Sequence, residues 1–111
     1  MAIEVISKFI AGATVKVTAY IKDEDGDLVD PTSVKIIITD PDGTEIIPSE
    51  GNGDDDMTQY EIDEVPQTGI YEYFYNTTTA STKGWWRGEV VVVDGDGDDK
   101  TSIGTFGFEV I

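Results

Sequence analysis

The stretch of residues 69–95, GIYEYFYNTTTASTKGWWRGEVVVVDG, decides the fold of this chain of 111 residues. It predicts two β-strands, 69–76 and 85–94, joined by a loop rich in Thr and Ser. Side chains alternate between the two faces of a strand, so Trp86 shares its face with Gly and Val, whereas Trp85 shares its face with Arg and Glu. Because burying a charge is costly, we expect Trp86 in the core and Trp85 outside.

The rest of the chain predicts short strands separated by turns. Alternating or apolar segments predict strands at residues 2–10, 14–22, 33–39, 45–47, 57–62 and 103–111. Alternation places Val15, Val17, Ala19, Ile21, Val34, Ile36 and Ile38 inward. Both faces of the strand 2–10 are apolar, so the sequence does not show which face points into the core. One of the two segments 45–47 and 57–62 is expected to be a short edge piece.

No stretch of about a dozen residues repeats apolar groups at helical spacing, so the chain is predicted to be all-β. The aromatic strand, followed by a Gly-Trp strand that ends in Asp-Gly, resembles the last third of a bacterial or phage-type immunoglobulin-like domain. The length suits one domain over residues 1–111, and seven to eight short strands at this spacing predict a sandwich of two antiparallel sheets. The resemblance implies that this sandwich is immunoglobulin-like. It makes 33–39, 85–94 and 103–111 neighbours, as strands C, F and G. The chain has no Cys, so no disulfide is expected.

The composition excludes several classes of function. The chain has 23 acidic and 7 basic residues, a net charge of −16, which repels nucleic-acid phosphates and anionic lipids. It has neither His nor Cys, so Ser/His and Cys/His catalysis is excluded and the usual zinc and haem ligands are missing. No run approaches the roughly 20 apolar residues of a membrane span. We therefore expect no enzyme, no nucleic-acid partner and no membrane insertion.

Two acidic loops are candidates for calcium binding, because Ca²⁺ prefers clustered carboxylate oxygens. The candidate ligands are Asp23, Asp25, Asp27, Asp94, Asp96 and Asp98. Neither loop fits the EF-hand pattern, because Leu28 and Asp99 stand where that pattern has Gly. The alternative, which we favour, is that Asp and Gly are turn residues here. Strands C and F run side by side, so both loops are expected at the same end of the sandwich. We expect that no cofactor is required, and calcium binding remains the alternative.

A second candidate site lies on the outer face of strands C, F and G. Alternation places an apolar set there, with Arg87 among it: Ile37, Trp85, Val91, Val93, Ile103 and Ile111. We expect these residues to form one apolar patch, and exposed patches of this kind mark interfaces. The alternative is that the N-terminal strand or a loop covers it. The segment 11–13, Ala-Gly-Ala, is a candidate hinge that would let residues 2–10 pair with a neighbouring subunit.

These features predict a structural or interaction domain. The resemblance implies an accessory protein of a phage or archaeal virus particle, such as a capsid decoration or tail-associated domain, with a capsid, a tail or a second copy as partner. Glu4 and Lys8 interrupt the N-terminal apolar run, so no signal peptide is expected, and the location would be the virion, or the cytoplasm before assembly. The alternatives are an extracellular adhesion or surface-layer module, and a carbohydrate-binding module with Trp85, Tyr20 and Phe74 as an aromatic platform.

Overall fold

The computed structural model of this chain describes residues 2–11, 14–47, 55–77, 81–94 and 100–111. The described residues form nine strands and no helix. Their bounds are β1 Ala2–Ala11, β2 Thr14–Lys22, β3 Ser33–Thr39, β4 Glu45–Ile47, β5 Asp55–Asp56, β6 Thr58–Ile62, β7 Val65–Asn76, β8 Gly84–Asp94 and β9 Lys100–Val110. In this part of the chain no helix is long and apolar enough to span a membrane.

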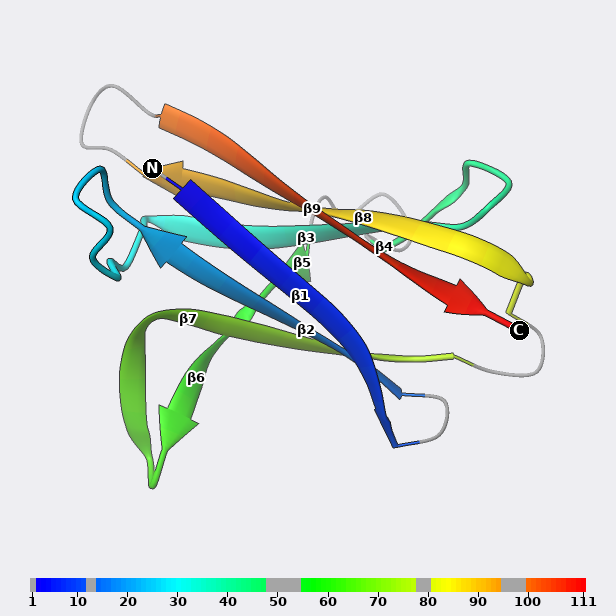
Figure 1. The fold of residues 1–111 in the computed structure, drawn as a ribbon, viewed down its shortest axis with the longest axis horizontal. Coiled ribbons are helices and arrows are strands. Elements are labelled where there is room, and N and C mark those ends of the chain that lie inside the picture. The colour runs from blue at the N-terminus through cyan, green and yellow to red at the C-terminus, as the bar shows by residue number, and fades with distance from the viewer. Residues whose placement is uncertain (1, 12–13, 48–54, 78–80, 95–99) are drawn as a thin grey trace.

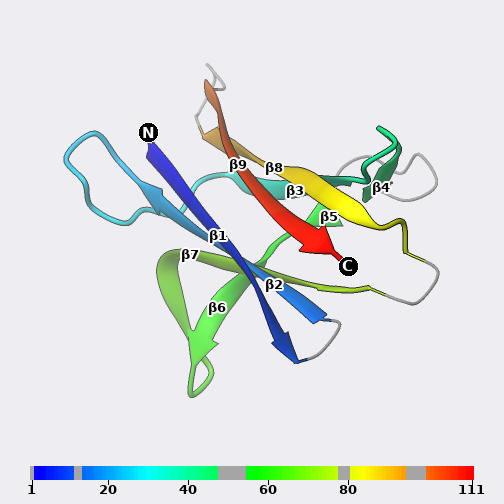
Figure 2. The same ribbon diagram turned by 45° about the vertical axis from the view of Figure 1, so that its right-hand side comes forward.

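The strands form two antiparallel sheets that pack face to face (Figures 1 and 2). One sheet has the order β1-β2-β7-β6 and the other the order β4-β3-β8-β9, with the two-residue β5 also paired to β3. These orders correspond to strands A-B-E-D and C-F-G of an immunoglobulin-type sandwich, with β4 added at one edge. The predicted two-sheet, all-β fold is therefore confirmed.

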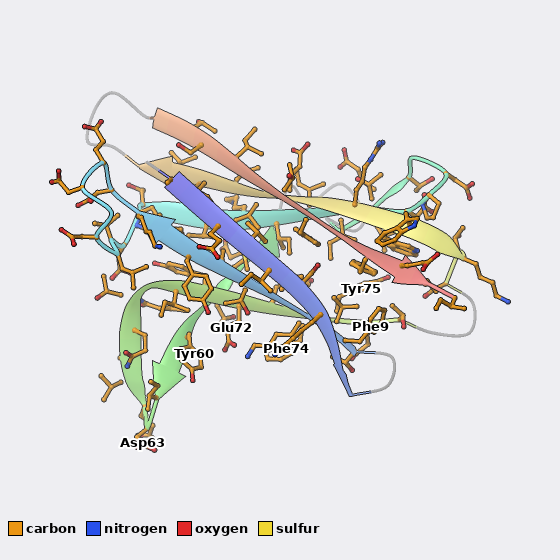
Figure 3. All side chains as sticks on the ribbon, in the orientation of Figure 1. Phe9, Tyr60, Asp63, Glu72, Phe74 and Tyr75 are labelled. Carbon is orange, nitrogen blue, oxygen red and sulfur yellow. The ribbon has the colours of Figure 1, made fainter. Side chains whose placement is uncertain are left out.

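Most strand bounds agree with the sequence prediction, and β7 differs most. It begins at Val65, because a two-residue turn at Asp63 and Glu64 joins it directly to β6. Both turn residues have positive φ, 50° and 67°, the backbone of a type I′ hairpin turn that Gly and Asn usually occupy. Asp63 lies at the tip of this projecting hairpin (Figure 3). As expected, one of the two uncertain segments is a short edge strand, namely the three-residue β4.

The core is built by alternation in the central strands of both sheets. The fully buried side chains from β2 are Val15, Val17, Ala19 and Ile21, and those from β3 and β8 are Ile36, Ile38, Val90 and Val92. Trp86 is 3% exposed, and its Nε1 donates a hydrogen bond to the carbonyl oxygen of Thr82 at 2.7 Å. Its ring centroid lies 5.8 Å from those of Tyr75 and Phe108. The expected burial of Trp86 is confirmed.

The β1 strand closes one side of the sandwich, next to β9. A Cβ added at Gly104 of β9 would lie 2.7 Å from side-chain carbons of Ile3 and Val5, so these two residues face inward. The Phe9 ring meets Phe108 edge-on at 6.0 Å. In the structure β1 pairs with β2 of its own chain, from Ala2 to Ala11. Residues 12–13 of the candidate hinge lie outside the described residues.

Asp30 ties the loop after β2 to the β6–β7 hairpin. Its Oδ1 accepts hydrogen bonds from the Gly69 amide at 2.8 Å, the Gln59 Nε2 at 2.9 Å and the Tyr71 hydroxyl at 3.3 Å. Gly69 has φ of 75°, and a Cβ there would lie 2.9 Å from Leu28 Cβ. Glycine is therefore needed where this loop crosses β7.

Candidate interaction surface

The outward side chains of β3, β8 and β9 form a face that we call the β8 face, after its central strand. Strand β8 pairs with β3 on one side and with β9 on the other. Its inward residues are held in the core, so alternation turns the residues between them to the outside. All seven residues of the predicted interface belong to these strands or follow them directly: Ile37, Trp85, Arg87, Val91, Val93, Ile103 and Ile111.

Trp85 is the most prominent aromatic side chain of the β8 face, with 67% of its surface exposed. It lies opposite Glu109 of β9. On its other side it has no neighbour in β3, because that strand ends at Thr39, opposite Arg87. Trp86 is locked in the core by the hydrogen bond to Thr82, so the outward direction of Trp85 is fixed by its neighbour. The Trp85 ring is thus exposed to solvent, and β3 does not extend far enough to lie beside it.

A group of aliphatic side chains lies further along the β8 face. Val91 is directly opposite Ile103 of β9, which is 57% exposed. Ile37 is opposite Glu89 and is therefore a diagonal neighbour of Val91. Val93 follows two residues later on the same side of β8. We call Ile37, Val91, Val93 and Ile103 the Val91 cluster.

Two charged residues interrupt the apolar residues of the β8 face. Trp85 and Val91 are six positions apart, a span of about 20 Å along a strand. Arg87 and Glu89, both exposed, fill the outer positions between them. Ile111 is 95% exposed and follows the end of β9 that pairs with Gly84, so it belongs to the Trp85 end. The face has two apolar parts with a polar strip between them.

Within the described residues, nothing covers the β8 face. The N-terminal strand β1 is the edge strand of the other sheet, and its Ile3 and Val5 side chains lie against the inner side of β9 at Gly104, so it does not form the expected cover. Lys35 at the β3 side pairs with Asp56 of β5 at 3.6 Å. Strands β3, β8 and β9 place two basic residues, Lys35 and Arg87, and two acidic ones, Glu89 and Glu109, on this face. Asp56, opposite Lys35, adds a third carboxylate at its edge. The face therefore has a small net negative charge on a chain of charge −16.

The first acidic loop is organised as a turn. Asp23 Oδ1 accepts hydrogen bonds from the amides of Asp25 at 2.9 Å and Asp27 at 3.0 Å. Asp40 makes the same pair of bonds, at 2.9 Å each, to the amides of Asp42 and Thr44. Gly26 and Gly43 have nearly equal φ values, 87° and 89°. The two Asp-x-Asp-Gly segments are therefore copies of one turn, as the turn interpretation predicts.

No group of three acidic, His or Cys side chains suited to a metal ion occurs in the described part of the chain. Asp23, Asp25 and Asp27 are within that part and do not form such a group. The side chains of Asp94, Asp96 and Asp98 lie outside it. The strand ends that flank the two loops lie at the same end of the sandwich, since Ser33 pairs with Val93, but residues 95–99 themselves are not among the described residues.

The expected aromatic platform is not formed. Trp85 lies on the β8 face, whereas Tyr20 and Phe74 lie on the outer face of the other sheet, on β2 and β7. That outer face holds a groove that the sequence reasoning missed, lined in part by Tyr20 and Tyr60. Tyr60 lies at a register shift between Gln59 and Glu61, which simple alternation does not predict.

No protein-family model, no curated protein and no solved structure matches this chain.

Proposed function

We propose that this protein is a non-enzymatic docking domain that binds a protein assembly through the β8 face. The observation that carries the proposal is the exposure of Trp85, 67%, on a sheet face that no other described element covers. Exposed apolar groups gathered on one face favour a protein interface. The Val91 cluster provides a second point of contact on the same face.

The composition of the β8 face suits protein binding. Trp and Arg are the side chains whose truncation most often costs an interface about 2 kcal/mol or more, and Trp85 and Arg87 lie on the same side of β8. The named residues of the face contribute only a small part of the chain's charge of −16, so this face would repel an acidic partner less than the rest of the surface would. Glu89 and Arg87 would give polar contacts between the two apolar parts.

The assembly that we propose is a phage or archaeal virus particle, with the domain on the capsid or the tail. The support is the resemblance of residues 69–95 to phage-type immunoglobulin-like domains, an argument by analogy of fold. A sandwich held by its core, with exposed apolar groups on one face, suits a part that is added to a larger structure.

Co-sedimentation with purified particles tests this proposal. The domain would be expressed with a tag in cells that produce the particles, and the particles would be separated on a density gradient. We expect the wild-type domain in the particle fraction and the double variant Trp85→Ser, Ile103→Thr in the unbound fraction. Both changes are at exposed positions, so the melting temperature should change little.

Phe74→Ser is the matched control. It removes an exposed aromatic ring, 52% accessible, from the opposite sheet, so it should leave co-sedimentation unchanged. The proposal fails if the double variant stays with the particles, or if Phe74→Ser is released as completely as the double variant.

A further inference from the structure

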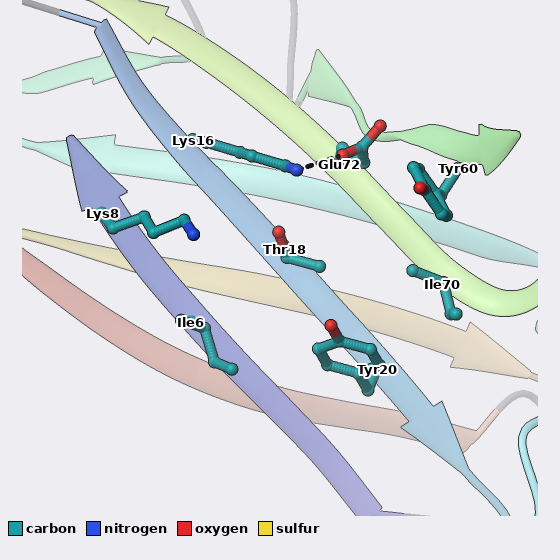
Figure 4. Close-up of a pocket in the computed structure, with 8 residues that line it drawn as sticks. All are labelled: Ile6, Lys8, Lys16, Thr18, Tyr20, Tyr60, Ile70 and Glu72. Carbon is teal, nitrogen blue, oxygen red and sulfur yellow. Dashed lines mark ion pairs between the residues drawn. The ribbon is translucent and has the colours of Figure 1, made fainter. Parts of the chain in front are cut away.

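A groove crosses the outer face of the other sheet, on the side of the molecule away from the β8 face. It has a volume of about 250 Å³ and extends over β1, β2, β7 and β6 (Figure 4). Its lining combines ammonium, carboxylate, hydroxyl and aromatic groups: Lys8, Lys16, Thr18, Tyr20, Tyr60 and Glu72. Such a mixture of a few polar groups with aromatic rings is typical of a small-molecule site.

Two of the seven basic residues of the chain lie directly opposite each other in this groove. Lys8 of β1 pairs in register with Lys16 of β2, and like charges in that arrangement destabilise a sheet. Lys16 is compensated by Glu72, with its Nζ 3.1 Å from the carboxylate, and its Nζ lies 5.9 Å from the centroid of the Tyr60 ring. No described carboxylate is within ion-pair distance of Lys8. Figure 4 shows both ammonium groups extended along the groove, with only Lys16 reaching a carboxylate.

The rest of the lining has free hydrogen-bonding groups on an apolar base. The hydroxyls of Thr18, Tyr20 and Tyr60 make no hydrogen bond to any other described residue. Ile6 and Ile70 complete the lining, and the register places Ile6 beside Thr18 and Ile70 beside Tyr20. The groove therefore has one unpaired cation, three free hydroxyls, one carboxylate and two aromatic rings.

We propose that this groove binds a saccharide residue that carries a carboxylate, such as a uronic acid. The Lys8 ammonium binds the carboxylate, which gives Lys8 the counter-charge that Glu72 already gives to Lys16. The rings of Tyr20 and Tyr60 contact the apolar face of the sugar ring, and the Thr18 hydroxyl and the Glu72 carboxylate hydrogen-bond to its hydroxyl groups. This site is independent of the β8 face.

Two observations favour a sugar acid over an acidic peptide. The free groups are mainly hydroxyls, which donate to and accept from sugar hydroxyls equally well. Among the groove residues, only the Lys8 ammonium has no ion-pair partner in the described part of the chain. Because the whole chain has a charge of −16, a ligand with several adjacent negative charges would be repelled. A sugar acid has one carboxylate for the ammonium of Lys8 and several hydroxyl groups for the hydroxyls that line the groove.

Titration of the isotope-labelled protein by nuclear magnetic resonance tests the inference. The probes are glucuronate, glucose, acetate and a short peptide of glutamate residues, each added at the same concentrations. We expect glucuronate to shift the backbone amides of β1, β2 and β7 that line the groove, with glucose and acetate binding more weakly. Lys8→Gln should weaken glucuronate binding about tenfold, the usual scale of a lost charge-assisted hydrogen bond.

Lys22→Gln is the matched control, since Lys22 is a lysine of the same sheet face that does not line the groove. It removes the same charge and should change glucuronate affinity less than about twofold. Four results would each overturn the inference: no shift at the groove, equal binding of glucose, equal shifts with acetate, or tighter binding of the acidic peptide. An equal loss of glucuronate affinity in Lys8→Gln and Lys22→Gln would also overturn the inference, because it would indicate attraction by overall charge and not by Lys8.

Discussion

The ring of Phe106 lies over Gly88, its partner on the neighbouring strand. A Cβ added at Gly88 would be 2.1 Å from Phe106 Cζ and 2.4 Å from Cε1, and the two residues are directly opposite in the β8–β9 register. An aromatic ring packed on a strand glycine fills the space that a side chain would take. The absence of a side chain at residue 88 is therefore part of the core packing.

Gly88→Ala is expected to destabilise the domain by about 1–3 kcal/mol, the cost of overpacking, as measured by urea unfolding. Gly107→Ala is the control at an outward position, where the added Cβ would meet only the Trp86 carbonyl oxygen, at 3.2 Å, and should cost less. Replacing Phe106 by Leu should remove most of the penalty of Gly88→Ala. Additive costs in the double variant would show that the ring does not rest on the glycine.

The two adjacent tryptophans should respond differently to truncation. Trp86→Ala removes a side chain that is 3% exposed and packed on Tyr75 and Phe108, so it should cost about 3–5 kcal/mol of unfolding free energy. Trp85→Ala should cost less than about 1 kcal/mol. Thermal melts of the two variants check this, and equal losses would contradict the assigned facing of β8.

Alternation predicted the faces of the strands well, because it depends only on the backbone. The inward sets of β2 and β3 and the burial of Trp86 were all available from the sequence. Alternation also places Arg87 and Glu89 between Trp85 and Val91 on the outer face of β8, but it does not give the register of β8 with the neighbouring strands. Only the pairing of Ile37 with Glu89 and of Val91 with Ile103 shows where the apolar groups meet.

Three other features could not be predicted from the sequence pattern. Both faces of β1 are apolar, and its contact with Gly104, about a hundred residues later, selects the inward set. The turn at Asp63 and Glu64 has positive φ without Gly or Asn, so its composition is not that of the usual hairpin. The groove near Tyr60 needs a register shift in β6, which leaves no periodic signal.

Alkaline pH is expected to destabilise the domain through Tyr71. Burial, together with the charge of Asp30 and the hydrogen bond to it, raises the pKa of Tyr71 from 10.0 to about 12. Between these values the unfolded chain loses the phenol proton while the folded protein keeps it. The contribution of Tyr71 to the free energy of unfolding is therefore complete below pH 10 and is lost as the pH rises towards 12. Burial and the charge of Asp40 raise the pKa of Tyr75 as well, with the same sign.

Urea unfolding between pH 9 and about 12 measures this decline. Tyr71→Phe should make the slope shallower, because that position no longer has a proton to lose. Asp30→Asn removes the carboxylate charge that opposes ionisation of Tyr71, so the pKa of Tyr71 in the folded protein should move back towards 10.0. The decline in stability should therefore end at a lower pH. A slope identical in the wild type and in Tyr71→Phe would contradict the assignment to this tyrosine.

The last prediction separates a turn from a calcium site at Asp23. With a net charge of −16, the domain should be stabilised by added salt, which screens the repulsion among carboxylates. Asp23 Oδ1 already accepts two amide hydrogen bonds, so we expect CaCl₂ and MgCl₂ at equal ionic strength to raise the melting temperature equally.

Asp23→Asn keeps the accepting oxygen and should preserve stability, whereas Asp23→Ala loses both bonds and should cost about 1–3 kcal/mol. A larger effect of calcium than of magnesium that disappears in Asp23→Asn would identify Asp23 as a calcium ligand instead. An excess that survives this variant would direct the search to Asp94, Asp96 and Asp98.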